Sequence, residues 1–309
     1  MQLLITGGAG FIGSNLARIA LSGGHSVRVL DDLSTGRRSN LLGLNVDLVQ
    51  ATILDYPAVV KAMSGADAAV HLGAIPSVPR SVANPRASHE ANATGTLNVL
   101  EAARETNVRH LSVASSSSVY GANPKLPKNE FDYTRPMSPY AVSKQATEGY
   151  ALAYQFSYGL PTMAFRFFNV YGPGQAADHD YAAVIPKFLD AALHGRPATV
   201  HGDGTQSRDF TFVETVCSVL LEAAERCVTS TDPVNLAFET NTSLIELLDR
   251  IERQLGHPVA REFSEPRVGD VKASQADCGR VKELFGHVVP VSLEHGLAAT
   301  IEWMKGQDR

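Results

Sequence analysis

Cysteine is scarce in this sequence, and the few that occur form no recognisable pattern. Cys217, Cys227 and Cys278 are the only cysteines in 309 residues. Because they are odd in number and far apart, they argue against a disulfide framework, and none has the short spacing of a metal site. We therefore expect no bound metal ion and a reduced, cytoplasmic location.

Positive charge and long apolar runs are scarce as well. The net charge of -5 lacks the basic footprint of a nucleic-acid-binding protein, so we expect no nucleic-acid partner. No apolar run reaches the length of a membrane span, and because a strand-like run begins at residue 2, we expect no signal peptide. His179, between Asp178 and Asp180, has no further ligand at metal-binding spacing, which favours a solvated loop.

What the chain does contain is an alternation of short apolar runs with helix-like stretches. Hydrophobic residues make up 44% of it, enough for a large core. Continuous apolar strands separated by helices are typical of a parallel sheet covered on both faces, so we predict a Rossmann-type, doubly wound α/β fold. The predicted strands are residues 3–5, 27–30, 46–49, 68–71 and 110–114, and the predicted helices are residues 12–21, 56–63, 93–106 and 139–158.

The pattern changes after about Gly172, where glycine and proline become more frequent. A helix is still predicted at residues 244–255, between loops. We therefore predict two domains. Residues 1–172 form the nucleotide-binding domain, and residues 173–309 form mainly a smaller α/β substrate lobe, with some segments returning to the first domain.

A glycine-rich loop follows the first predicted strand and opens the first predicted helix. In Thr6-Gly7-Gly8-Ala9-Gly10-Phe11-Ile12-Gly13, Gly7 permits a tight turn, Gly10 allows a pyrophosphate to approach, and Gly13 allows the helix to pack on the strand. The N–H groups of the helix N-terminus then face the phosphates. With a strand before it and a helix after it, the loop predicts a dinucleotide site.

An acidic residue follows at the end of the second predicted strand. Asp31 there can accept hydrogen bonds from the adenosine ribose and repel a 2′-phosphate, which favours NAD over NADP. Asp32 fits either the cofactor or the turn that follows. Arg37 and Arg38 could instead accommodate NADP, so that alternative stays open.

A tyrosine and a lysine lie four residues apart in the predicted helix 139–158. The phenol of Tyr140 and the ammonium of Lys144 share one helix face. We expect the ammonium and a positive nicotinamide to lower the pKa of the phenol, giving a general base for a sugar hydroxyl. The serine run 115–118 follows the fifth predicted strand, where a hydroxyl can contact the reacting alcohol.

In combination, these motifs make the chain resemble the extended short-chain dehydrogenase/reductases of the NAD-dependent nucleotide-sugar epimerase/dehydratase family. The resemblance covers nearly the whole length and includes further motifs at residues 71–74, 166–173, 202–210 and 267–270. It implies NAD as cofactor, a UDP-sugar substrate and a homodimer formed by the helices at residues 93–106 and 139–158. An aspartate is common in the family where Thr52 stands here, which puts the adenine contact of that position in doubt.

The resemblance also implies a role for individual residues. Ser116, Tyr140 and Lys144 match the catalytic positions. The residues implied in NAD binding are Gly7, Gly10, Phe11, Ile12, Gly13, Asp31, Asp32, Ser34, Thr35, Gly36, Thr52, Ile53, Leu72, Gly73, Ala74, Asn92, Tyr140 and Lys144. Those implied in substrate binding are Ser77, Ser116, Ser117, Ser118, Tyr140, Asn169, Ala183, Val184, Lys187, Arg208, Arg267 and Asp270.

Ser117 and Ser118 bear on which reaction the chain catalyses. A nucleotide-sugar 4,6-dehydratase needs carboxyl groups at these positions, and a hydroxyl cannot replace them as acid or base. This elimination favours a 4-epimerase, which oxidises C4, lets the 4-keto sugar rotate and returns the hydride to its other face. It fails if an acid arrives from another loop, so the dehydratase stays an alternative.

The sugar itself is less well defined by the sequence. Residues 181–187 and 202–210 resemble those of bacterial epimerases that act on UDP-glucose or UDP-galactose and on UDP-GlcNAc or UDP-GalNAc, which we place first. Ser116, Ser117 and Ser118 could also hold the carboxylate of UDP-glucuronate, so a uronate 4-epimerase stays open. A non-catalytic NAD-binding regulator is a further alternative, although such a protein should lack Tyr140 or Lys144.

Overall fold

A single parallel sheet forms the centre of the computed structural model, which describes residues 1–177, 182–266 and 272–307. The order of its seven strands is β11-β6-β5-β4-β1-β2-β3, so the direction of winding reverses beside β1, as in Rossmann-type folds. The strands are β1 (Gln2–Thr6), β2 (Ser26–Leu30), β3 (Asp47–Val49), β4 (Ala68–His71), β5 (His110–Ser116), β6 (Thr162–Phe167) and β11 (Val234–Leu236).

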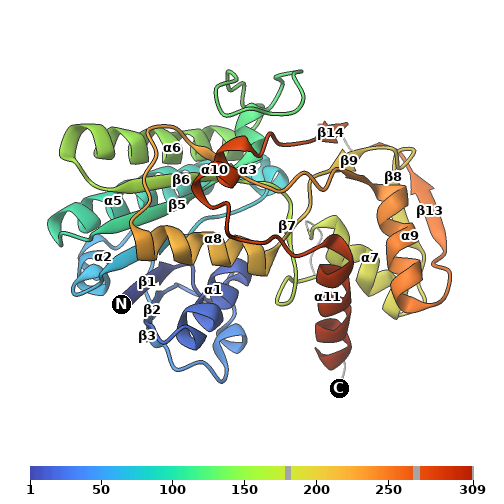
Figure 1. Cartoon of the computed structure of the whole chain (residues 1–309), viewed down its shortest axis with the longest axis horizontal. Coiled ribbons are helices and arrows are strands. Elements are labelled where there is room, and N and C mark those ends of the chain that lie inside the picture. Colours follow the sequence, from blue (N-terminus) through green and yellow to red (C-terminus); the bar gives the residue numbers. More distant parts are fainter. Residues whose placement is uncertain (178–181, 267–271, 308–309) are drawn as a thin grey trace.

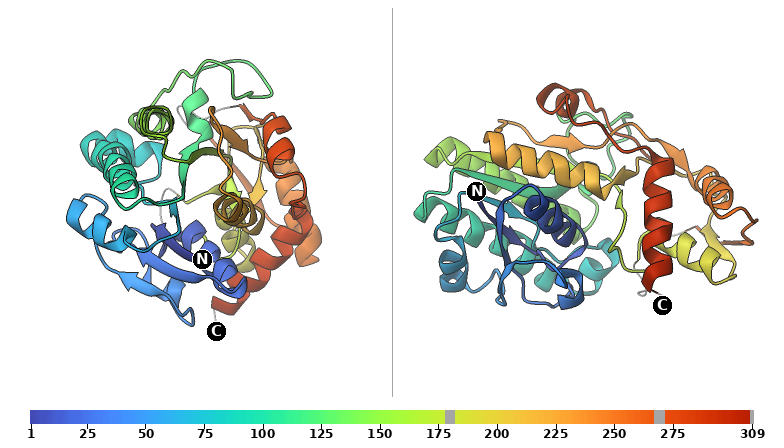
Figure 2. Two further views of the ribbon diagram at one scale, coloured as in Figure 1. Left: turned by 60° about the vertical axis from the view of Figure 1, so that its left-hand side comes forward. Right: turned by 60° about the horizontal axis from the view of Figure 1, so that its bottom comes forward.

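Helices cover both faces of this sheet (Figures 1 and 2). Successive side chains of a strand point to opposite faces, so Leu3 and Ile5 join the core beneath α1 and α8, while Leu4 joins the core beneath α2 and α5. The covering helices are α1 (Phe11–Ser22) and α8 (Val213–Arg226) on one face, and α2 (Tyr56–Met63), α5 (Gly95–Glu105) and α6 (Pro139–Tyr158) on the other.

Local sequence chemistry sets the ends of α6, which carries Tyr140 and Lys144. The Ser138 hydroxyl accepts a hydrogen bond from the Ala141 N–H at 3.1 Å, and Pro139 occupies the first helical position, where no N–H is needed. Gly159 ends the helix at a φ of 67°, a conformation that glycine adopts without strain. The 20 residues between them agree with the helix predicted at 139–158.

Short helical segments connect the larger elements of the first half of the chain. They lie mostly where the chain leaves the carboxyl end of a strand or approaches the next helix. These segments are η1 (Arg38–Leu41), α3 (Val78–Ala83), α4 (Pro85–His89), the π-helical turn η2 (Glu90–Thr94) and η3 (Ser117–Tyr120).

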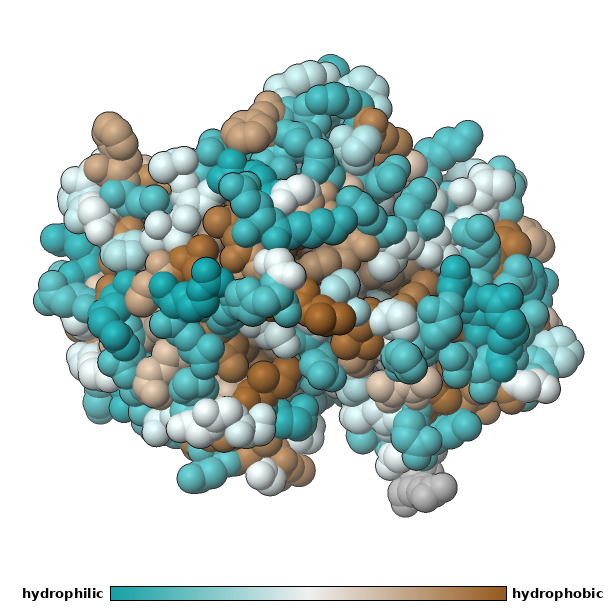
Figure 3. Space-filling view, in the orientation of Figure 1, coloured by the Kyte–Doolittle hydropathy of each residue, from teal (hydrophilic) through white to brown (hydrophobic). Residues whose placement is uncertain are grey.

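A second, smaller lobe lies to the right of the sheet in Figure 1, and an indentation separates the two lobes along the lower edge of Figure 3. Its strands pair as β8 with β13, as β7 with β10, and as β9 between β12 and β14. Its elements are β7 (Val170–Tyr171), α7 (Val184–Leu193), β8 (Ala198–His201), β9 (Ser207–Arg208), β10 (Thr211–Phe212), β12 (Thr242–Ser243), α9 (Leu244–Leu255), β13 (Arg261–Ser264), β14 (Ala273–Ser274) and α11 (Leu293–Gln307). The short helix α10 (Gly279–Leu284) instead lies over the central sheet, where it packs on β11 (Figure 1).

The structure confirms the predicted fold class and corrects several details. Two strands of the sheet, β6 and β11, were not predicted, and β11 comes from the second half of the chain. The fifth strand does not end at residue 114 but continues through Ser116, because its pairing with β6 extends to Phe167. Residues 93 and 94 belong to η2 rather than to α5, and Thr106 follows the end of α5.

Among the described residues, no helix combines the length and the apolar composition that a membrane span requires.

Candidate active site

The glycine loop forms a cradle at the N-terminus of α1. Gly7 has a φ of +69°, and a β-carbon there would lie 2.7 Å from the backbone nitrogen of Gly73, so the turn requires glycine. A β-carbon at Gly13 would collide with the Gly7 carbonyl. Gly10 precedes the helix and offers no side chain to the N–H groups of its first turn. These N–H groups fit the pyrophosphate of a dinucleotide.

Asp31 stands directly beside this loop at the end of β2. Its carboxylate is buried and accepts hydrogen bonds from the N–H groups of Ala9, at 2.9 Å, and Leu33, at 2.8 Å. Burial nevertheless raises its pKa above the ordinary value. Asp32 instead accepts from the N–H of Ser34 at 2.9 Å, which is turn chemistry. The two carboxylates therefore differ in burial and in hydrogen bonding.

The loop that follows β4 is held from beneath by buried polar groups. The ring nitrogens of His71 lie 2.7 Å from the Thr6 hydroxyl and 3.0 Å from the Thr96 hydroxyl, and burial lowers the pKa of His71 to about 3. Asn92 bonds both the N–H and the carbonyl of Ile75, and its amide donates to the Ser143 hydroxyl at 3.0 Å. Asn92 therefore ties this loop to α6.

Ser77 has a strained backbone within the same loop. Its φ of 100° lies in a region that residues with a side chain rarely adopt. Its hydroxyl accepts from the Arg80 N–H at 3.4 Å at the start of α3. The neighbouring Leu72 and Gly73 both bond to Thr6, through its carbonyl at 3.1 Å and its hydroxyl at 3.2 Å.

Tyr140 lies in the first turn of α6, with Ser116 of β5 facing it. Burial raises the pKa of the Tyr140 phenol, and a hydrogen bond with Ser116 lowers it. Burial is the larger effect in the protein chain by itself, so the expected lowering of this pKa depends on the positive nicotinamide and stays a prediction. The Ser116 hydroxyl also accepts from the Ser118 N–H at 3.2 Å, which starts η3.

Lys144 lies one helical turn after Tyr140 and is 5% exposed. Its ammonium donates to the carbonyl of Ala114 in β5 at 2.8 Å, two residues before Ser116. Burial lowers the pKa of Lys144 to about 8, and the carboxylate of Glu148 opposes this fall. Tyr140, Lys144 and Ser116 therefore meet at the carboxyl end of β5, as the sequence predicts.

A buried ion pair behind Lys144 was not predicted. The Glu148 carboxylate accepts two hydrogen bonds from the Arg166 guanidinium, both at 2.9 Å, and one from the Ser115 hydroxyl at 2.5 Å. The signal was present in the sequence, because Glu148 follows Lys144 by four residues on the same helix face. Arg166 lies in β6, a strand that was itself missed.

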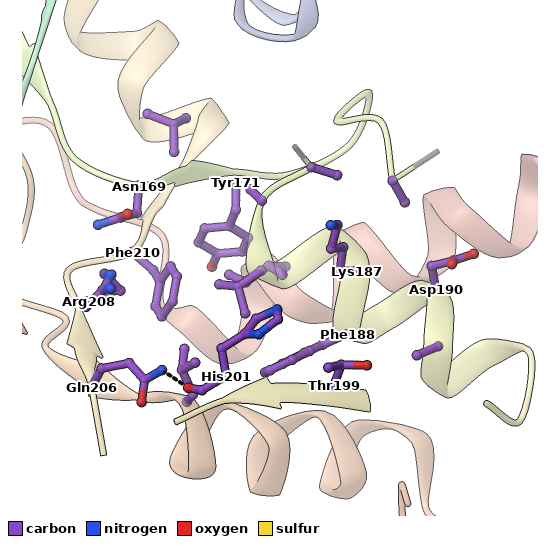
Figure 4. A pocket seen from close by; sticks show the side chains of 18 of the residues that line it. Asn169, Tyr171, Lys187, Phe188, Asp190, Thr199, His201, Gln206, Arg208 and Phe210 are labelled. Atoms are coloured by element: carbon purple, nitrogen blue, oxygen red, sulfur yellow. Dashed lines mark hydrogen bonds between the residues drawn. The ribbon is translucent and has the colours of Figure 1, made fainter. Parts of the chain in front are cut away.

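A cavity of about 880 Å³ opens in the second lobe (Figure 4). Asn169 and Arg208 lie on one side of it, and Lys187 of α7 lies on the other. Asn169 follows the end of β6 by two residues, and β6 pairs with β5 up to Ser116, so this cavity begins at the same edge of the sheet. Its rim carries positive charge on both sides, which suits a nucleotide diphosphate.

The cavity brings together five of the predicted substrate residues, namely Asn169, Ala183, Val184, Lys187 and Arg208. The predicted residues Arg267 and Asp270, and the segment 178–180, lie outside the described residues. The cavity also contains residues that sequence reasoning missed, among them His201, Gln206 and Phe210. No metal-ligating group of three or more His, Cys, Asp or Glu side chains occurs in the part of the chain that the structure describes.

Known proteins are similar to this chain in both sequence and fold. The family model described as the NAD dependent epimerase/dehydratase family matches residues 3–237. A UDP-glucose 4-epimerase of Mycolicibacterium smegmatis is 36% identical over 315 residues, which cover 100% of both chains. A probable UDP-glucuronate 4-epimerase of Rhizobium meliloti is 32% identical over 333 residues, covering 98% of this chain and 96% of the relative.

A solved structure extends this likeness to three dimensions. It is a UDP-N-acetylglucosamine 4-epimerase from Methanobrevibacter ruminantium in complex with UDP-N-acetylmuramic acid. The two structures agree with a TM-score of 0.94 at 33% identity, over 99% of this chain and 98% of that one. This chain therefore belongs to the NAD dependent epimerase/dehydratase family and is an NAD-dependent enzyme of the extended short-chain dehydrogenase/reductase type.

Proposed function

We propose that this enzyme is a UDP-sugar 4-epimerase whose substrate is a UDP-hexose or a UDP-N-acetylhexosamine. The observation that carries the proposal is the meeting of Tyr140, Lys144 and Ser116 at the sheet edge from which the 880 Å³ cavity opens. These three side chains suit acid/base chemistry on an alcohol, and the cavity suits a nucleotide diphosphate. Relatives named as UDP-glucose and UDP-N-acetylglucosamine 4-epimerases support it.

In this proposal the catalytic residues together remove the proton of the C4 hydroxyl of the sugar. Tyr140 takes its proton, Ser116 holds the reacting oxygen, and the positive charge of Lys144 favours the phenolate. NAD, which the glycine loop and Asp31 would hold, would accept the hydride from C4 and later return it. Tyr140 returns the proton after the keto sugar has turned its other face to the cofactor.

The cavity residues hold the nucleotide diphosphate. Arg208 and Lys187 face its negative charge from opposite sides, and Asn169 contributes an amide on the side of Arg208. Because the nucleotide half is bound this way, the sugar is free to rotate about the bond to the diphosphate. Such an arrangement fits an epimerase, which must present both faces of C4 to one cofactor.

The alternative functions differ in the side chains that they require around the sugar. Ser117 and Ser118 in η3 carry hydroxyls where a dehydratase needs carboxyl groups, which argues against the 4,6-dehydratase. The same serines could bond a C6 carboxylate, and the Rhizobium relative is named a probable UDP-glucuronate 4-epimerase, so the uronate is the second candidate. A non-catalytic regulator would leave the Tyr140–Lys144 pair without a use.

Incubation of the purified enzyme with UDP-glucose, UDP-GlcNAc and UDP-glucuronate, each separately, tests the proposal. We expect the 4-epimer of UDP-glucose or UDP-GlcNAc to appear without added NADH, because the hydride is returned to the sugar. Proton NMR of the product mixture measures this. A 6-deoxy-4-keto product would establish the dehydratase, turnover of UDP-glucuronate alone would establish the uronate epimerase, and no turnover would contradict an enzyme of this class.

The role of Tyr140 is tested by Tyr140→Phe, which removes only the hydroxyl. We expect kcat to fall by about 10²- to 10⁴-fold, the usual contribution of general acid/base catalysis, while NAD stays bound. Stopped epimerisation assays and the NAD released on denaturation measure the two effects. Tyr150→Phe, on an exposed position of the same helix, is the matched control and should leave kcat unchanged. A fully active Tyr140→Phe enzyme would show that the base lies elsewhere.

The role of Arg208 is tested by Arg208→Ala. Hydrogen bonds from a guanidinium to a charged partner contribute about 1.5–3 kcal/mol, so we expect KM for the UDP-sugar to rise by about 10- to 150-fold. Initial rates against substrate concentration give KM. The control is Arg109→Ala. Arg109 is exposed, precedes the amino end of β5 and pairs with Asp67, far from the carboxyl end where the site lies, so KM should stay unchanged. An unaltered KM in Arg208→Ala would remove Arg208 from the substrate site.

We also propose that the enzyme is a homodimer that pairs through α5 and α6. Large apolar side chains remain exposed on α6 in the single chain, including Val142 at 53% and Phe156 at 94%. Burying such a surface against a second copy is favourable.

Sedimentation equilibrium should therefore give a mass of about twice 33.1 kDa. Phe156→Glu should shift the enzyme toward the monomer, because it would bury a charge in the interface. Val289→Glu, at a position of comparable exposure (84%) after α10, should not. A wild-type protein that sediments as a monomer would contradict this assembly.

A further inference from the structure

Glu148 stands where α6 crosses the ends of β5 and β6. Ser115 and Arg166 are paired neighbours in these two strands, and both side chains donate to the Glu148 carboxylate. Lys144, one turn earlier in α6, donates to the carbonyl of Ala114, the residue next to Ser115. All four side chains are 5% exposed or less, so water contributes little to holding them. The two contacts fix the same stretch of α6 above the same stretch of β5.

The charges around Lys144 come from several packed elements. On α6 these are the carboxylate of Glu148 and the phenol of Tyr140. From β4 comes His71, which burial keeps neutral, and from β6 comes Arg166, which reaches Lys144 only through Glu148. Glu148 is therefore the one described carboxylate that opposes the effect of burial on Lys144. Without it, two buried cations would remain with no compensating charge.

We propose that Glu148, anchored by Arg166 and Ser115, is a positioning residue that keeps Lys144 charged and aimed at the Tyr140 side of β5. Glu148 does not touch the sugar or the cofactor in this proposal. The inference rests on the proposed function, in which the charge of Lys144 supports the Tyr140 phenolate. Its test nevertheless measures the protonation of Lys144 directly. With Tyr140 as a phenolate, the four groups Tyr140, Lys144, Glu148 and Arg166 carry no net charge, which is what a buried cluster requires.

The experiment is a titration of Lys144 in the holoenzyme by NMR, with lysines labelled at the carbon next to the ammonium. The loss of one signal in Lys144→Arg assigns the resonance. In Glu148→Gln, which removes the charge and keeps the shape, the midpoint of Lys144 should fall by about one pH unit or more, because a neighbouring opposite charge shifts a pKa by about one to three units. An unchanged midpoint would overturn the proposal.

Two further variants separate charge from folding. Glu148→Gln leaves the buried charge of Arg166 without its carboxylate partner and should lower the melting temperature, whereas Glu148→Gln/Arg166→Gln removes both charges and should recover part of it. The midpoint of Lys144 should stay low in the double variant. The control is Glu101→Gln on α5, a carboxylate that also pairs with an arginine, Arg104, and accepts from the Tyr154 hydroxyl. A midpoint that moves as far in this control would also overturn the proposal.

The pH dependence of kcat gives a second test, because a purely structural role of Glu148 would not shift it. The alkaline limb of the kcat profile should move to lower pH by the same amount in Glu148→Gln, since Lys144 loses its proton earlier, while KM stays within about twofold. A limb that stays in place while the NMR midpoint moves would show that the Lys144 charge does not control turnover. No turnover by the wild-type enzyme would contradict the proposed function alone, because the NMR titration still decides the role of Glu148.

Discussion

The Glu148–Arg166 ion pair fastens the catalytic helix to the sheet, and much of the site depends on it. Removing two charges from water is costly, and such a pair is retained only when further hydrogen bonds satisfy it. Here the guanidinium contacts both carboxylate oxygens and lies over the Tyr120 ring at 4.7 Å, and Ser115 supplies a third donor. The pair thereby holds α6 at one position along β5, and with it Tyr140 and Lys144.

The same network continues into the second half of the chain. The Tyr120 hydroxyl donates to Asn235 of β11 at 2.7 Å, and the Asn235 amide donates to the carbonyls of Lys128 and Asp277. Asp277 follows β14, the strand that pairs with β9 and therefore with Arg208. Hydrogen bonds and strand pairing thus connect α6 with the cavity, as the proposed substrate, which would span both, requires.

Burial sets the chemistry of the catalytic residues in opposite directions. It raises the pKa of the Tyr140 phenol and lowers the pKa of Lys144, so both groups tend toward their neutral forms. The phenolate consequently depends on positive charge placed close to it. In the proposed mechanism the positive nicotinamide of oxidised NAD would be one such charge, and Lys144, kept protonated by Glu148, would be the other.

The sequence by itself determined the features that depend on short-range chemistry. The glycine loop and Asp31 follow from backbone geometry within a few residues, and the pair Tyr140 and Lys144 follows from helical spacing. Ser138, Pro139 and Gly159 similarly determine where α6 begins and ends. The parallel sheet follows from continuous apolar strands, because these must be covered on both faces.

Only the tertiary structure decided which distant residues meet. Strand β11 enters the sheet after a long crossover, and nothing local to residues 234–236 specifies its neighbour. The register of β5 against β6 places Ser115 opposite Arg166, and α6 then brings Glu148 to both. The pKa of Tyr140 likewise depends on burial, a property of the packed chain. Long-range register and desolvation are set by the whole fold, so a sequence motif identifies candidate catalytic residues but does not determine whether they are charged.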